Sequence, residues 1–357
     1  MSILITGGAG YIGSHMAHHL VEAGEDFVVL DNLSTGVEKN LPRNIPFVRG
    51  DIADPALVSK LIDTYKVDSI IHFAGSVVVP ESVAKPLDYY ANNTSGARTL
   101  IETAIRQGVA NFIFSSTAAV YGTPKVLPVS EDSPTIPDSP YGRSKLMTEW
   151  MLQDAACAHP LKFGILRYFN VAGADPKGRT GQSTPRATHL IKRACQVATG
   201  QVPHLTIFGT DYDTPDGTGV RDYIHVSDLV DIHHRVVNHL RGDGQSLLIN
   251  CGYGRGFSVR EVAATVERVA GQKLEIEEAP RRPGDMASVV ANTTKLSKIL
   301  SWKPNHADLD TIVTTALHWE KRLKKELDEA GSKAEVSQEG AQALPPLIWH
   351  NTKLNGG

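Results

Sequence analysis

Gly7-Gly8-Ala9-Gly10-Tyr11-Ile12-Gly13 stands directly after the apolar run Ile3-Leu4-Ile5, near the start of the chain. A second apolar run, Phe27-Val28-Val29-Leu30, follows and ends at Asp31. A strand, a glycine-rich turn, a helix and a second strand that ends in an acidic residue form the βαβ unit that binds dinucleotides. The sequence therefore predicts such a unit at residues 2–31.

The glycines and the acid of this unit have separate predicted tasks. Gly7 permits the tight turn out of the first strand, and Gly10 lets backbone N–H groups approach a pyrophosphate at a helix N-terminus. Gly13 lets that helix pack closely on the strands. Asp31 can accept hydrogen bonds from both hydroxyls of an adenosine ribose, and its charge would repel a 2′-phosphate. We therefore expect the cofactor to be NAD rather than NADP.

Apolar runs and longer amphipathic stretches alternate through the first half of the chain. This alternation predicts an α/β protein with a doubly wound parallel sheet of the Rossmann type, covered by helices on both faces. The predicted strands are 2–6, 27–31, 46–49, 69–73, 111–115 and 161–168, and the predicted helices are 12–23, 54–65, 88–107 and 141–158.

Ligands of such a sheet bind at the carboxyl ends of its strands. The residues at those ends are Asp31-Asn32, Gly50-Asp51-Ile52, Phe73-Ala74-Gly75, Ser115-Ser116-Thr117 and Phe169-Asn170. Because these ends share one edge, we expect them to form the binding site. Asp51 is expected to hydrogen-bond the adenine and Ile52 to cover it.

The chain changes character after residue 170. A loop rich in Gly, Pro and Thr (173–187) leads to a predicted helix at 188–199 and a short strand at 204–208. We expect an NAD-binding domain at 1–170, a smaller C-terminal α/β substrate lobe at 171–325 with segments that return to the first domain, and a polar tail at 326–357.

The composition argues against several classes of protein. A net charge of −3 over 357 residues gives no reason to expect nucleic acid or an anionic membrane as a partner. Cys157, Cys195 and Cys251 are too far apart for a disulfide framework and do not fall at metal-ligand spacing. The first predicted strand follows Met1 directly and no apolar stretch approaches the ~20 residues of a spanning helix, so we expect a cytoplasmic protein without a signal peptide.

Ser139-Pro140-Tyr141-Gly142-Arg143-Ser144-Lys145 is the second strong signal. Ser139 suits an N-cap and Pro140 the first helical position, so Tyr141 and Lys145 should lie four residues apart on one helical face. A free tyrosine has a pKa near ~10, and a nearby ammonium together with oxidised nicotinamide would lower it. We expect Tyr141 to be the catalytic base, with Lys145 and the hydroxyl of Thr117 beside it.

With these motifs, the chain resembles the extended short-chain dehydrogenase/reductase family and, within it, the UDP-glucose 4-epimerases (UDP-galactose 4-epimerases). The resemblance runs from residue 2 to about 320. The matching stretches are GGAGYIGSH (7–15), DNLSTG (31–36), HFAG (72–75), ESVAKPLDYYANN (81–93), FIFSSTAAVYG (112–122), SPYGRSK (139–145), LRYFNVAGA (166–174), DGTGVRDYIHVSDL (216–229) and RRPGD (281–285).

The resemblance implies a set of NAD-binding residues. Tyr11 and Ile12 would lie under the pyrophosphate, and Lys145 would bridge the nicotinamide ribose and Tyr141. The other residues implied to line NAD are Gly7, Gly10, Gly13, Asp31, Asn32, Leu33, Ser34, Thr35, Gly36, Asp51, Ile52, Phe73, Ala74, Gly75, Asn92 and Phe169.

The resemblance also implies a UDP-sugar substrate, and we expect a homodimer. Thr117 and Tyr141 would contact the sugar 4-hydroxyl, Arg221 and Arg282 would clamp the diphosphate, and Asp285 would accept hydrogen bonds from the uridine ribose. The residues implied to hold the rest of the nucleotide sugar are Asn170, His189, Leu190, Thr206, Ile207 and Phe208.

Val289 lies four residues past Asp285, where the family's residue borders the C2 substituent of the sugar. Valine leaves room for an N-acetyl group that an aromatic ring would fill. The position is equally explained as a core residue of a strand at 288–291.

The implied activity is C4 epimerisation of UDP-glucose and UDP-galactose through a transient 4-keto sugar, with Tyr141 as base. Two positions depart from the family pattern: Val77 replaces a common lysine near the cofactor phosphates, and Thr117 replaces a common serine but keeps the hydroxyl. Related sugar-nucleotide 4,6-dehydratases and decarboxylases carry acidic residues after the hydroxyl residue, whereas Ala118 and Ala119 cannot move protons.

Two alternatives stay open. A 4-epimerase of a UDP-N-acetylhexosamine, UDP-pentose or UDP-uronate would have the same catalytic core. A non-catalytic NAD-binding regulator is the other alternative, although such a protein would not need the pair Tyr141 and Lys145.

Overall fold

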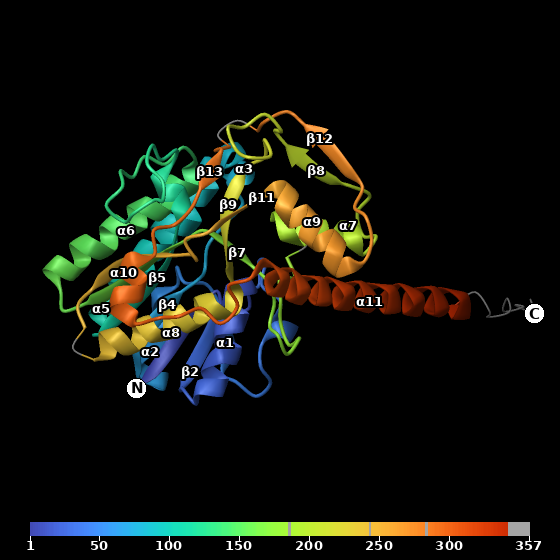
Figure 1. Ribbon diagram of the computed structural model, residues 1–357. Coiled ribbons are helices and arrows are strands. Elements are labelled where there is room, and N and C mark those ends of the chain that lie inside the picture. Colours follow the sequence, from blue (N-terminus) through green and yellow to red (C-terminus); the bar gives the residue numbers. More distant parts are fainter. Residues whose placement is uncertain (185–186, 243, 283–284, 342–357) are drawn as a thin grey trace, which may run out of the picture.

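The computed structural model describes residues 1–184, 187–242, 244–282 and 285–341, with side chains as far as Glu329. The first lobe is built on a seven-stranded parallel sheet in the order β10-β6-β5-β4-β1-β2-β3 (Figure 1). The bounds are β1 Ser2–Thr6, β2 Phe27–Asp31, β3 Phe47–Arg49, β4 Val67–His72, β5 Asn111–Thr117, β6 Lys162–Tyr168 and β10 Leu247–Cys251. The Rossmann-type sheet and its first six strands are confirmed, and β10 joins from the second half of the chain.

Helices cover both faces of this sheet. One apolar layer contains α1 (Tyr11–Ala23), α8 (Val226–Arg241) and α10 (Thr294–Leu300). The other contains α2 (Pro55–Tyr65), α5 (Ala97–Arg106) and α6 (Pro140–Ala158). Successive strand residues point to opposite faces, so Ile3 and Ile5 pack in the first layer and Leu4 in the second. Burial on both faces explains why these strands read as continuous apolar runs.

The segment predicted as one helix at 88–107 is divided in the structure. It consists of α4 (Pro86–Tyr89), the π-helical turn η2 (Tyr90–Gly96) and α5, and it follows the short helix α3 (Val79–Ala84). The π-helical turn contains Asn92 and Asn93, which both bond Ser76 in the loop after β4. Hydrophobic periodicity does not report such a turn, so the sequence predicted a single uninterrupted helix.

The second lobe contains two small sheets and a cluster of helices. Strand β9 lies between β11 and β13 and also pairs with β7, while β8 pairs with β12. The bounds are β7 Asn170–Ala172, β8 Leu205–Phe208, β9 Val220–His225, β11 Gly256–Ser258, β12 Ile276–Ala279, β13 Ser288–Val289, α7 Leu190–Ala198, α9 Val259–Ala270 and α11 Leu309–Ala341. Two single 3-10 turns, η1 (Glu38–Asn40) and η3 (Ala118–Tyr121), belong to the first lobe.

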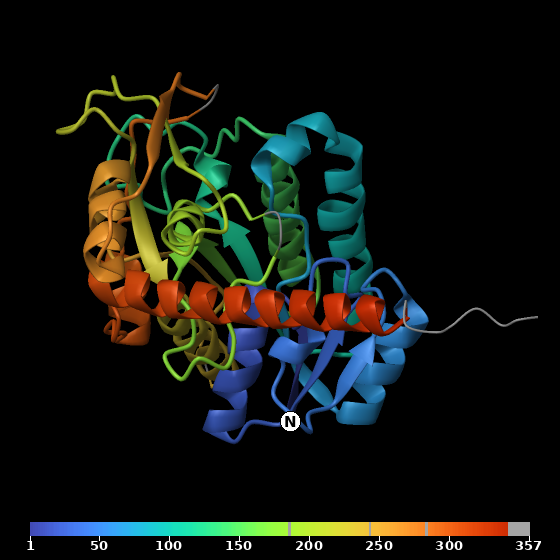
Figure 2. The same cartoon turned by 90° about the vertical axis from the view of Figure 1, so that its right-hand side faces the viewer.

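Helix α11 packs on α7 and α9 and then continues toward the first lobe. Figure 2 shows it lying across the front of the molecule, and Glu326 forms an ion pair with Lys39 at 2.5 Å. The helix continues past residue 326, where the sequence placed the start of the polar tail, and residues 342–357 lie outside the described part of the chain. Every helix among the described residues is too short or too polar to span a bilayer.

Candidate active site

The turn between β1 and α1 forms a cradle that fits a dinucleotide. Gly7 has a φ of +70°, and a Cβ there would lie 2.4 Å from the Ala74 backbone nitrogen at the end of β4. A Cβ at Gly13 would lie 2.3 Å from the Gly7 carbonyl oxygen, so α1 can approach the turn only without a side chain there. Gly10 is the N-cap of α1 and no side chain caps this end. The amides of the first helical turn are thus left for an anion, as a pyrophosphate requires.

Asp31 ends β2 beside this cradle and is buried. Its Oδ2 accepts the Ala9 amide at 2.9 Å, and its Oδ1 accepts the Leu33 amide at 2.8 Å. Each carboxylate oxygen keeps a further lone-pair direction for a ribose hydroxyl. A Cβ at Gly36 would lie 2.9 Å from Oδ1, so this glycine permits the close approach of the 31–36 loop to the carboxylate.

The adenine end predicted from the sequence lies next to Asp31. Asn32 Nδ2 donates to Asp51 Oδ2 at 3.1 Å, and the Asp51 Oδ1 accepts the Ala53 amide at 2.9 Å. Ile52 is buried in the apolar layer of α2 and α5. The structure therefore brings the ends of β2 and β3 together.

Helix α6 places Tyr141 and Lys145 at the carboxyl edge of the sheet. Ser139 caps the helix by accepting the Gly142 amide at 3.1 Å, as the sequence predicts. Lys145 is buried and its Nζ donates to the Ser115 carbonyl at 3.0 Å, near the end of β5. Burial lowers the pKa of Lys145 to about 8.

The pKa of Tyr141 differs from the sequence-based expectation. Burial raises it above the ordinary value, and a hydrogen bond with Thr117 acts in the opposite direction. The expected lowering of this pKa by Lys145 is not seen in the protein alone, where the ammonium donates to the Ser115 carbonyl. The positive nicotinamide ring, the other expected cause, is not part of the chain.

A buried ion pair fixes α6 behind the candidate catalytic residues. Arg167 of β6 donates to Glu149 of α6 through Nε at 2.9 Å and through a terminal nitrogen at 2.5 Å. Ser116, next to Thr117, also donates to Glu149. The side chains of Arg167 and Glu149 are 5% and 0% exposed. This network ties α6 to β5 and β6, so it sets the position of Tyr141 relative to Thr117.

Asn93 is a site residue that the sequence reasoning missed. Its Oδ1 accepts the Ser76 amide at 2.7 Å, and its Nδ2 donates to the Ser76 carbonyl at 2.9 Å and to Ser144 Oγ at 3.1 Å. It therefore connects the loop after Gly75 to the residue preceding Lys145. The predicted neighbour Asn92 bonds only the Ser76 hydroxyl among the described contacts. The sequence did offer a signal for Asn93: it is a polar residue on the side of the predicted helix 88–107 that the apolar pattern buries.

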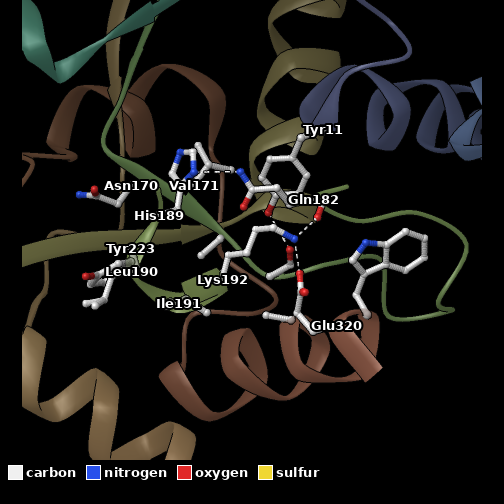
Figure 3. Close-up of a pocket in the computed structure, with 14 residues that line it drawn as sticks. Tyr11, Asn170, Val171, Gln182, His189, Leu190, Ile191, Lys192, Tyr223 and Glu320 are labelled. Atoms are coloured by element: carbon white, nitrogen blue, oxygen red, sulfur yellow. Dashed lines mark hydrogen bonds and ion pairs between the residues drawn. The ribbon is translucent and has the colours of Figure 1, made fainter. Parts of the chain in front are cut away.

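A pocket lies between the cofactor turn and the second lobe (Figure 3). Asn170, His189 and Leu190, which the sequence assigned to the nucleotide sugar, all line it. Tyr11 of the cofactor turn also lines it and donates to the Gly173 carbonyl at 2.6 Å. The cofactor turn and these candidate substrate residues therefore share one cavity.

The remaining candidate substrate residues gather around two arginines. Arg282 donates to Asp285 Oδ2 at 2.8 Å and its guanidinium lies 4.7 Å from the ring centroid of Phe208. Arg221 lies 4.0 Å from Asp285, and Val289 pairs with Arg221 in the β9–β13 register. Thr206 and Ile207 precede Phe208 in β8, while Pro283 and Gly284 of the RRPGD stretch lie outside the described residues. In the protein alone both arginines pair with Asp285, so these three side chains together carry a net charge of one positive unit.

Residues 3–252 match the model of the NAD dependent epimerase/dehydratase family. A UDP-glucose 4-epimerase of Azospirillum brasilense is 56% identical over 330 residues, which cover 92% of this chain and 95% of that protein. The crystal structure of UDP-glucose 4-epimerase from Bifidobacterium longum in complex with NAD+ and UDP has a TM-score of 0.84 at 39% identity, covering 90% of this chain and 98% of that one. The structure of the UDP-Glc/GlcNAc 4-epimerase from Campylobacter jejuni has a TM-score of 0.79 at 46% identity, covering 90% and 99%.

Proposed function

The chain belongs to the NAD dependent epimerase/dehydratase family, and from that membership we propose how its residues divide the work of the reaction. It is an NAD-dependent isomerase that interconverts UDP-glucose and UDP-galactose by inverting C4 through a transient 4-keto sugar. The observation that carries the assignment of roles is the placement of Tyr141 and Lys145 at the sheet edge that also carries the dinucleotide cradle.

Tyr141 removes the proton of the sugar 4-hydroxyl and returns it at the end of the cycle. When bound, NAD supplies the reversible two-electron oxidation of C4. Thr117 hydrogen-bonds Tyr141 and offsets part of the rise in its pKa that burial causes, and Lys145 adds a buried positive charge near the end of β5. Ala118 and Ala119 leave no second acid or base next to Thr117, so the groups present suit epimerisation rather than elimination.

Arg221, Arg282 and Asp285 hold the UDP part of the substrate in this proposal. Two guanidinium groups beside one carboxylate favour a diphosphate, and the arginine forks suit phosphate oxygens. A firm hold on UDP lets the 4-keto sugar turn and present its other face to the same cofactor. Asn170, His189 and Leu190, which line the pocket in Figure 3, hold the rest of the nucleotide sugar in this proposal.

The direct test is to incubate the purified protein, without added NAD, with UDP-glucose, UDP-galactose and a panel of other UDP-sugars, and to separate the products. Conversion of UDP-galactose to UDP-glucose up to a fixed equilibrium ratio is expected. Bound NAD with no turnover of any UDP-sugar would instead favour the non-catalytic regulator.

Val289 leads to a prediction about the width of the sugar pocket. It is buried in β13, beside Arg221 and thus next to the proposed UDP-binding residues. We expect measurable turnover of UDP-N-acetylglucosamine by the wild type. Val289→Tyr is expected to suppress that activity more than turnover of UDP-galactose, because the ring fills the space of the C2 substituent. The ratio of the two kcat/KM values measures the effect.

Val289→Ile serves as the matched control, because it adds bulk without a ring and should leave the ratio close to that of the wild type. No N-acetylhexosamine turnover by the wild type, at enzyme concentrations that equilibrate UDP-galactose within minutes, would show that the pocket argument is wrong. A core role alone for Val289 would lower both activities equally.

The homodimer is also proposed, with the surface formed by α4 and α6 as its interface. Leu87 of α4 is 78% exposed, and Trp150 and Met147 of α6 are 54% and 38% exposed. Large apolar side chains gathered on one surface mark a contact with a partner. Sedimentation equilibrium is expected to give twice the chain mass for the wild type and the single-chain mass for Trp150→Glu. A wild-type monomer at micromolar concentration would contradict this.

A further inference from the structure

A buried ion pair lines the pocket and has no part in the roles described so far. Lys192 of α7 and Glu320 of α11 pair with side chains that are 5% and 3% exposed (Figure 3). Lys192 Nζ also donates to the carbonyl of Gln182 at 2.7 Å. Gln201 donates to the other oxygen of Glu320 at 3.2 Å. The pair therefore holds the backbone of the loop that precedes α7.

Helix α11 fixes this loop at two consecutive residues. A Cβ at Gly181 would lie 2.4 Å from Cγ of Trp319, so the backbone of Gly181 lies against the indole ring. The next residue, Gln182, is held by Lys192 and, through it, by Glu320. The position of Gln182 is thus set by two neighbouring residues of a helix more than a hundred positions later in the chain.

The side chain of Gln182 transmits this position to His189. Its Nε2 lies 2.9 Å from Nδ1 of His189. With the Gln182 amide in this orientation its nitrogen donates to Nδ1, and this arrangement requires the neutral tautomer with the proton on Nε2. The pKa of His189 is lowered, first by desolvation and then by the charge of Lys192, although the side chain is exposed in the protein alone, and the lower pKa favours this neutral form. The ring is left with one N–H donor, which suits an acceptor oxygen of a ligand.

We propose that Lys192, Glu320 and Gln182 are positioning residues for the nucleotide sugar: the buried pair fixes Gln182, and Gln182 holds His189 in the orientation and tautomer that donate to the substrate. The inference rests on the proposed function, because it assigns His189 to the UDP-sugar pocket. It adds residues of the same pocket that the motifs of the chain do not identify.

The first test removes the link between Gln182 and His189. In Gln182→Ala, KM for UDP-galactose is expected to rise about threefold to tenfold, in line with the loss of one hydrogen bond, while kcat changes less than about twofold. The dissociation constant of UDP-galactose, measured by calorimetry, should rise by the same factor. Gln201→Ala is the matched control: it removes a contact to the same Glu320 but not the link to His189, and both constants should stay at wild-type values.

A double-variant cycle separates positioning from a loss of structure. His189→Ala and Gln182→Ala/His189→Ala should have the same KM, because Gln182 acts only through His189. Additive increases, or an unchanged KM and dissociation constant in Gln182→Ala, would overturn the inference. A wild type that binds UDP-galactose without turnover would contradict the proposed function instead, and the dissociation constants would still decide the positioning role.

The second test concerns the ion pair itself. Glu320→Gln leaves a buried ammonium without its partner and can fail to fold, so Lys192→Met/Glu320→Met is the informative variant, since it replaces both charges by apolar groups of similar length. It is expected to fold, to keep wild-type kcat within about twofold, and to raise KM as Gln182→Ala does. Lys192→Arg keeps the charge and the hydrogen-bond donor, so its affinity for UDP-galactose should lie between those of the double-methionine variant and the wild type. A wild-type KM in the double-methionine variant would overturn the role of the pair.

Discussion

Replacing Tyr141 by phenylalanine is expected to reduce turnover of UDP-galactose by about 10²–10⁴-fold, the usual contribution of a general base. The substitution removes only the hydroxyl and keeps the ring, which packs edge-on against Tyr89 with centroids 6.5 Å apart. The fold and the dinucleotide cradle should therefore be unchanged. Initial rates measured at equal concentrations of NAD-loaded protein would give the ratio.

The control for this variant is Tyr65→Phe, which removes a phenol at the end of α2, outside the pocket. It should retain wild-type turnover, and both variants should carry the same amount of NAD by absorbance. A Tyr141→Phe protein with more than a tenth of wild-type activity would show that another group acts as the base.

Glu149→Gln is expected to lower the free energy of unfolding by about 3–5 kcal/mol, because it leaves the buried guanidinium of Arg167 without a counter-charge. The amide keeps the size of the side chain, so the loss comes from charge rather than from a cavity. Urea unfolding followed by tryptophan fluorescence would measure it. Because the pair also positions α6 and hence Tyr141 relative to Thr117, turnover by the folded variant at low temperature should fall as well.

An exposed pair provides the comparison. Glu102 of α5 pairs with Arg106 at 2.5 Å, with side chains that are 38% and 68% exposed, and Glu102→Gln should cost less than about 1 kcal/mol. Arg167→Met/Glu149→Gln should regain part of the stability lost in the single variant. Equal unfolding midpoints for Glu149→Gln and Glu102→Gln would contradict the role assigned to the buried pair.

Local patterns predicted the fold well because the central strands are buried on both faces. β1 and β2 have the predicted bounds, and α6 starts within one residue of its predicted position because Ser139 and Pro140 mark a helix start. The cofactor cradle was equally predictable, since its glycines lie within one turn of chain. Each of these features is determined by residues close together in the sequence.

Features that depend on distant contacts were not predictable in this way. The π-helical turn around Asn93 follows from bonds to Ser76 and Ser144, which a helical pattern does not contain. The pairing of Lys192 with Glu320 joins residues 128 positions apart. The pKa of Tyr141 was expected to fall because the sequence puts Lys145 one turn away, but the spacing does not reveal that the ammonium bonds Ser115. Residue type and spacing thus predicted candidate groups, while their hydrogen-bond partners could be read only from the fold.

The course of α11 limits how the protein can be shortened or fused to another. At 1.5 Å per residue its 33 residues extend about 50 Å, and along that length it contributes Trp319 and Glu320 to the pocket and Glu326 to a bond with the first lobe. A shortened gene product that stops before Glu326 loses the bond to the first lobe, and one that stops before Trp319 also loses the back wall of the pocket. Truncation points for affinity tags and fusion partners therefore need to lie beyond Glu326, so that both contacts of α11 are kept.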